Sequence, residues 1–202
     1  MKLKKWELAL ICALVFTLLY GSAMAKEQED LSEKLIRLHV VANSDSDEDQ
    51  TLKLKVRDAV FERMTKLLGG VADRDEAVRL VEVNLDTIIA ESKRVLNEQG
   101  CRHDVAAEIS VEDFPTRKYD TFSLPAGKYV SLRVVIGDGG GKNWWCVIFP
   151  PLCMTAATNS REVFDQLTDE QIKLITSDAP EYVIKFKSIE WLNKIKEWLG
   201  LK

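Results

Sequence analysis

Hydrophobic and polar positions change their period along the chain, and each change marks an expected element. Leu35–Ala42 is dense in apolar and β-branched residues, which predicts a strand. Apolar side chains then recur every three or four residues over two long stretches, which predicts two helices. The first is expected to end at Gly69-Gly70, and the second to run from about Asp75 to Gln99.

The next part of the chain has the two-residue period of strands. Apolar and polar residues alternate over Val105–Glu112, and Tyr129–Ile136 and Trp144–Phe149 are also expected strands. The glycine-rich segment Gly137–Gly141 lies between the last two and predicts a flexible hairpin loop. A last strand is expected at Tyr182–Phe186.

Two further helices are expected near the C-terminus. Thr168-x-x-Gln171 is a capping pattern that predicts the start of a short helix. Ile189–Leu199 places apolar residues on one side, and Trp191 and Trp198 flank them. Such a helix can lie on a membrane, but its mixed polar face favours packing onto the sheet. The predicted class is α+β: a largely antiparallel sheet packed against two long helices and a C-terminal amphipathic helix.

The first 25 residues have the form of a secretory leader. Three lysines within the first five residues precede the uncharged run Leu8–Leu19, and Ala23-Met24-Ala25 offers a small-x-small cleavage site. We expect cleavage after Ala25, with an uncleaved anchor as the alternative. Residues 26–202 are then a single extracytoplasmic α+β domain, whose polar start, Lys26–Lys34, is expected to be frayed.

Charge and motif content exclude several function classes. With 28 Lys+Arg against 32 Asp+Glu and a net charge of -4, the chain lacks the basic surplus of a general nucleic-acid binder. Asp45-x-Asp47-x-Asp49 has the spacing of a calcium loop, but Gln50 stands where the obligatory Gly should be. Gly137–Asn143 does not match a phosphate-binding loop. We therefore expect no catalytic residues, no cofactor and no metal, and predict that the chain is not an enzyme.

Three cysteines follow the predicted leader, at positions 101, 146 and 153. Cys146 and Cys153 are the expected disulfide pair, because Pro150-Pro151 between them can reverse the chain. Three free, buried thiols are the alternative.

Two stretches, Ile36–Asp58 and Leu124–Cys153, have an unusual composition. They contain the strings ANSDS-x-x-DQ, which begins at Ala42, and GKNWWCV-x-FPPLC, which begins at Gly141. On these strings the chain resembles the stage II sporulation protein R family of endospore-forming bacteria.

The resemblance implies a secreted signalling protein. Members of the family are made in the forespore and exported into the space between the forespore and mother-cell membranes. There they trigger a membrane-embedded aspartic protease, which removes the pro-sequence of the transcription factor sigma-E. The implied partner is that protease, with no nucleic acid and with peripheral membrane contact through the C-terminal helix. An extracytoplasmic hydrolase of the cell wall or envelope is the alternative function, and a passive envelope-binding module is a third.

The two adjacent tryptophans are the predicted functional edge of this domain. Successive side chains of a strand point to opposite faces, so Trp145 shares a face with Val147 and Phe149 and is expected in the core. Trp144 would then be free to contact a partner, unless a helix covers its face too and both tryptophans are structural. The predicted partner-binding residues are Lys142, Asn143 and Trp144.

Overall fold

The computed structural model describes residues 4–119, 122–152 and 167–176. The helices are α1 (Lys5–Ser32), α2 (Asp47–Leu67), α3 (Arg74–Val83), α4 (Leu85–Glu98) and α5 (Asp169–Thr176). The strands are β1 (Ile36–Val41), β2 (Val105–Phe114), β3 (Arg117–Lys118), β4 (Ser123–Leu124), β5 (Gly127–Ile136) and β6 (Asn143–Phe149). The strand predicted at Tyr182–Phe186 and the helix predicted at Ile189–Leu199 lie outside the described residues.

Four strands form the main sheet, in the order β2-β5-β1-β6. β1 is parallel to β5 and antiparallel to β6, while β2 is antiparallel to β5. The α+β class is therefore confirmed, but the sheet is mixed rather than largely antiparallel. Every residue of β1 is buried, as expected of a strand with neighbours at both edges and cover on both faces. β1 enters the sheet between β5 and β6, which separates two strands that are consecutive in sequence.

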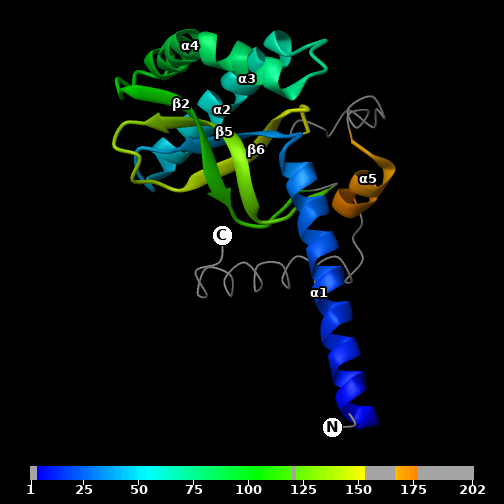
Figure 1. Cartoon of the computed structure of the whole chain (residues 1–202). Helices are drawn as coiled ribbons and strands as arrows, with labels where there is room; N and C mark the ends of the chain where they lie inside the picture. Colours follow the sequence, from blue (N-terminus) through cyan, green and yellow to red (C-terminus); the bar gives the residue numbers. More distant parts are fainter. Residues whose placement is uncertain (1–3, 120–121, 153–166, 177–202) are drawn as a thin grey trace.

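Helices α2, α3 and α4 cover one face of the sheet (Figure 1). Their apolar sides and the facing strand residues form the main core, and each fully buried aliphatic side chain contributes about 1.5–3 kcal/mol through removal from water. Members of this core include Leu38, Val40, Val56, Val60, Met64, Ile88, Leu96, Leu132 and Val134.

Polar side chains that form hydrogen bonds with the backbone mark the start of α2 and the interruption between α3 and α4. The amide of Asp49 donates to the hydroxyl of Ser46 over 3.1 Å, which caps α2. The single helix predicted from Asp75 to Gln99 is instead two helices that meet at Asn84. The side-chain amide of Asn84 donates to the Leu80 carbonyl, and its backbone angles (φ -105°, ψ 7°) are not helical.

The second face of the sheet packs against the C-terminal end of α1, the β3–β4 hairpin and α5 (Figure 1). Leu31 and Leu35 are fully buried there, together with Phe114 and Tyr129. Residues 26–32 are therefore an anchored part of the fold, and the expectation that this segment is frayed is wrong. Leu31, the one apolar residue of the sequence from Lys26 to Lys34, fixes an otherwise polar segment by its burial.

Helix α5 begins with the predicted capping pattern. The amide of Gln171 donates to the hydroxyl of Thr168 over 3.2 Å, and the amide of Thr168 donates back to the Gln171 side chain over 3.1 Å. Lys34 also donates to the Gln171 side chain. This contact joins the end of α1 to α5.

Helix α1 runs without a break through the predicted leader and past Ala25 into the anchored segment. No helix in the described part of the chain is both long and apolar enough to cross a membrane. Cleavage after Ala25 stays a prediction.

The burial of Leu31 can be tested by mutation. Leu31→Ala is expected to lower the free energy of unfolding by about 2–5 kcal/mol, because it leaves a cavity under the second face of the sheet. The matched change Lys26→Ala, at an exposed position of the same helix, should stay within about 0.5 kcal/mol of the wild type. Urea denaturation measures both, and equal stability of the two variants would mean that this segment does not anchor the fold.

Candidate functional site

The two unusual sequence stretches meet in space at the C-terminal end of β1. Residues 42–50 turn from β1 into α2, and residues 137–144 lead from β5 into β6. We call these two segments together the motif junction. The residues predicted to bind a partner, Lys142, Asn143 and Trp144, are the last three of the second segment.

The glycine loop of the motif junction passes over the end of β1 rather than closing a hairpin. The amide of Gly140 donates to the carbonyl of Asn43 over 3.0 Å, and the amide of Gly141 donates to the carbonyl of Ala42 over 2.9 Å. A Cβ atom at Gly137 would collide with the Asn43 side chain. The prediction of a flexible hairpin is therefore wrong: β1 lies between β5 and β6, and the glycines allow the backbones to touch.

Side chains of the turn after β1 hold the motif junction together. The carboxylate of Asp49 accepts hydrogen bonds from Ser44 (2.5 Å) and Asn43 (2.8 Å), and lies 3.3 Å from His103. The hydrogen bonds from Ser44 and Asn43 favour the charged form and hold the pKa of Asp49 below its usual value. Asp45 accepts from the amide of Lys142 over 2.7 Å. Two of the three acids with calcium-loop spacing therefore bind groups of the chain itself.

Lys53 connects α2 to the glycine loop. Its ammonium group donates to the carbonyl of Lys142 over 3.0 Å and to the side chain of Gln50 over 2.5 Å. The residue is buried, and removal from water lowers the pKa of Lys53. Both backbone groups of Lys142 are thus fixed, one by Asp45 and one by Lys53.

The three predicted partner-binding residues lie side by side and exposed where β6 begins. Trp144 exposes 38% of its surface, and its ring lies 4.3 Å from the guanidinium carbon of Arg57 on α2. This cation–π contact holds the ring in one orientation without burying it. Asn143 is paired with Val41 at the end of β1. Lys142, Asn143 and Trp144 are thus exposed and consecutive at the start of β6, and because adjacent strand residues alternate, the side chains of Asn143 and Trp144 point to opposite faces of the sheet.

Trp145 points to the second face of the sheet and is partly buried. Its ring stacks on His39 at 3.8 Å and meets Phe114 edge-on at 4.6 Å. The prediction that Phe149 shares the face of Trp145 is wrong, because the pairing of β6 with β1 shifts between Ile36 and Arg37 and places Phe149 in the main core.

Cys146 is buried against the helical layer. Cys153, its predicted disulfide partner, lies outside the described residues, so the bridge stays a prediction.

Sequence reasoning missed a second candidate site, around Arg37 at the centre of the second face. Arg37 is fully buried, and its guanidinium donates to the hydroxyl of Tyr119 over 2.6 Å and to the carbonyl of Cys146 over 3.4 Å. Its guanidinium carbon lies 4.1 Å from the ring centre of Phe114 and 5.0 Å from that of Tyr129. Burial lowers the pKa of Arg37 and raises the pKa of Tyr119.

His39 lies on the same face as Arg37. Its Nδ1 atom is 3.1 Å from the carboxylate of Glu112, which is also 3.6 Å from the guanidinium of Arg133. The signal for this site was present in the sequence: Arg37 and His39 are two residues apart in an apolar strand, so both must lie on one face. A buried charge at the centre of a sheet calls for a partner.

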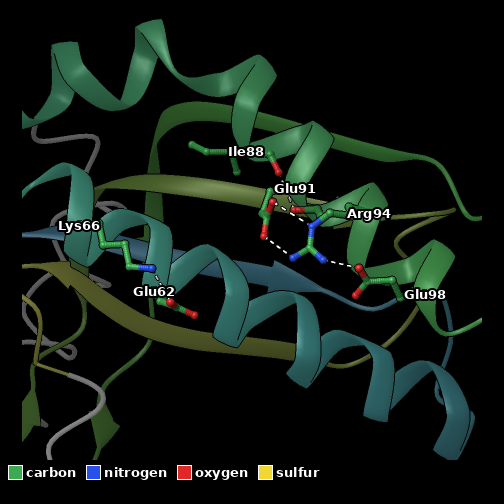
Figure 2. Close-up of polar contacts among 7 residues, drawn as sticks. Glu62, Lys66, Ile88, Glu91, Arg94 and Glu98 are labelled. Carbon is green, nitrogen blue, oxygen red and sulfur yellow. Dashed lines mark hydrogen bonds and ion pairs between the residues drawn. The ribbon is translucent and has the colours of Figure 1, made fainter.

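The outward surface of the helical layer carries pairs of oppositely charged side chains, unlike the motif junction and the surroundings of Arg37. On α2 Lys66 pairs with Glu62, and on α4 Arg94 lies between Glu91 and Glu98 (Figure 2). These pairs are three or four residues apart and follow the helix surface. Glu62, Lys66, Arg94 and Glu98 are all exposed, so this surface is a solvated one.

The close backbone contact in the motif junction predicts that alanine at Gly141 lowers stability much more than alanine at Gly140. A Cβ atom at Gly141 would overlap the backbone carbonyl of Ser44, so Gly141→Ala should lower the free energy of unfolding by about 1–3 kcal/mol. At Gly140 the Cβ atom would lie 3.3 Å from the carbonyl oxygen of Asn43, so Gly140→Ala needs only a small adjustment. Thermal or urea denaturation compares the two, and an equally mild effect at Gly141 would argue against the close contact.

Comparison with known proteins identifies the family of the chain. The family model for stage II sporulation protein R matches residues 32–159. The chain is 31% identical to stage II sporulation protein R of Bacillus subtilis (strain 168), over 92% of this chain and 97% of that protein. No solved structure matches the chain. The chain therefore belongs to the stage II sporulation protein R family, and its role lies in sporulation.

Proposed function

We propose that the chain is a secreted signalling protein of endospore formation. In this proposal it is exported into the space between the forespore and mother-cell membranes, where it activates a membrane-embedded aspartic protease. The protease then processes pro-sigma-E in the mother cell. The chain itself acts as a ligand, not as an enzyme, and the catalytic groups belong to its partner.

One observation carries the proposal beyond family membership: the exposed ring of Trp144 on the edge of the motif junction. Exposed aromatic side chains on a rigid support are typical anchors of protein interfaces, because they bury a large area at little cost in conformational entropy. The exposed polar residues Lys142 and Asn143 directly precede Trp144 in the chain and suit the rim of such an interface.

The support for Trp144 is built from both unusual sequence stretches. Asp45 and Lys53 fix the backbone of Lys142, and Arg57 lies against the ring of Trp144. The residues before and within the N-terminal half of α2 thus pre-organise the edge. A pre-organised edge loses less entropy on binding, which favours recognition of one conformation of the partner.

Activation follows from a difference in affinity. A ligand shifts a protease between inactive and active states only to the extent that it binds the active state more tightly, typically by about 1–3 kcal/mol. Removal of the Trp144 ring should abolish most of that difference in affinity.

The proposal predicts separate effects for the two tryptophans. Trp144→Ala should fold nearly as stably as the wild type yet lose activation, because it removes an exposed anchor of about 2 kcal/mol or more. Trp145→Ala should cost about 3 kcal/mol of stability, because its ring packs on His39 and Phe114. Processing of pro-sigma-E is measured in a non-sporulating host that produces this chain, the protease and pro-sigma-E, beside denaturation of each purified variant.

Val83→Ala is the matched control, since Val83 is another exposed apolar residue (78%) and lies on α3, away from the motif junction. It should leave both stability and processing unchanged. A stable and fully active Trp144→Ala variant would remove this edge from the site. Unprocessed pro-sigma-E with the wild-type chain would refute the activator role, and degradation of purified cell wall by the chain would favour the hydrolase instead.

A further inference from the structure

Arg37 carries a buried positive charge for which the described residues supply no carboxylate partner. Its neighbours are a phenol, a backbone carbonyl and two aromatic rings. The Nη1 atom is buried and makes no hydrogen bond to any described residue. Cation–π contacts offset part of the cost of burying a guanidinium, but an unpaired charge in a protein interior remains expensive.

Other buried polar side chains lie on the same face of the sheet as Arg37. Ser131 is opposite Arg37 in the pairing of β1 with β5, and its hydroxyl has no hydrogen-bond partner among the described residues. Within the same described part of the chain, His39 Nε2 and Trp145 Nε1 are also buried without a hydrogen-bond partner, and these two rings are stacked on each other.

Arg37 Nη1 and Trp145 Nε1 can only donate a hydrogen bond, whereas the Ser131 hydroxyl can donate or accept. In a neutral His39 ring the proton lies on Nδ1, toward Glu112, and Nε2 is an acceptor. The two obligate donors, on Arg37 and Trp145, therefore require an acceptor. A guanidinium with a free Nη1 and a neutral phenol on its other terminal nitrogen is suited to bind a carboxylate through two parallel hydrogen bonds. A single negative charge would neutralise Arg37, whereas His39 already has the carboxylate of Glu112 beside it.

Of the described side chains that contact the guanidinium of Arg37, those of Phe114 and Tyr129 are buried and that of Tyr119 is partly exposed, so an approach from solvent is expected on the Tyr119 side. The Tyr119 hydroxyl donates in turn to the carbonyl of Trp145 over 3.3 Å. Arg117 is exposed, and its guanidinium carbon lies 5.7 Å from the ring centre of Trp145. A second positive charge at this approach attracts anions toward the first.

We propose that Arg37, with Ser131 and Trp145, is a binding site for a carboxylate, which reaches the guanidinium beside Tyr119 and Arg117. The incoming carboxylate replaces the Tyr119 hydroxyl on one terminal nitrogen of Arg37 and accepts from Nη1 with its other oxygen. The same chemistry is offered by a small free carboxylate and by an acidic side chain of a protein. The proposal does not depend on the activation of a protease.

Titration of the purified, ¹⁵N-labelled chain with acetate tests the site, at an ionic strength held constant with chloride. The indole N–H resonance of Trp145, assigned with Trp145→Phe, and the Nε–H resonance of Arg37 should move and saturate together. A glutamate-rich peptide and its lysine-rich counterpart form the second arm. Saturation by the glutamate-rich peptide well below the concentration needed for acetate identifies a protein side chain as the source, and saturation by acetate alone identifies a small carboxylate.

Two variants test whether Arg37 and Arg117 contribute to carboxylate binding. Arg37→Lys keeps the charge but loses the planar fork, so binding should weaken by about tenfold or more, the equivalent of one charge-assisted hydrogen bond. Arg117→Gln, at an exposed position that cannot disturb the core, should weaken binding by a smaller factor and leave the saturated spectrum unchanged. The absence of saturation by both acetate and the acidic peptide would overturn the proposal. So would equal binding to folded Arg37→Lys, or tighter binding of inorganic phosphate than of acetate.

Discussion

The close backbone contact between the end of β1 and the glycine loop is the constraint on which the rest of the structure depends. Ala42 and Asn43 accept hydrogen bonds from Gly141 and Gly140 at a separation that leaves no room for a side chain at Gly141. Because β1 lies between β5 and β6, the loop that joins those two strands must pass over the end of β1. The same contact fixes the start of β6, and with it the exposed ring of Trp144.

The elements with a clear hydrophobic period could be predicted from the sequence. The helix expected to end before Gly69-Gly70 and the alternating strand from Val105 are present, and so is the cap at Thr168. These features depend on neighbours within a few residues, so local sequence contains the information. The opposite directions of Trp144 and Trp145 follow for the same reason, since adjacent strand residues alternate between faces.

The features that depend on distant segments could not be predicted. A glycine-rich link between two strands is typical of a hairpin, and nothing local reveals that β1 separates β5 from β6. The burial of Leu31 depends in the same way on packing against α5 and the β3–β4 hairpin. Arg37 was visible as a charge in an apolar strand, but the lack of an acidic neighbour among the described residues appears only when the four strands are assembled.

The central claim is that the edge of the motif junction contacts the membrane protease. Site-specific photocrosslinking tests it most directly, with a photoreactive residue in place of exposed Asn143 and, as control, in place of Lys66 on the solvated side of α2. In cells that make both proteins, we predict a covalent adduct with the protease from position 143 and none from position 66. Adducts from position 66 alone, or from neither position, would contradict the assignment of this edge as the contact surface.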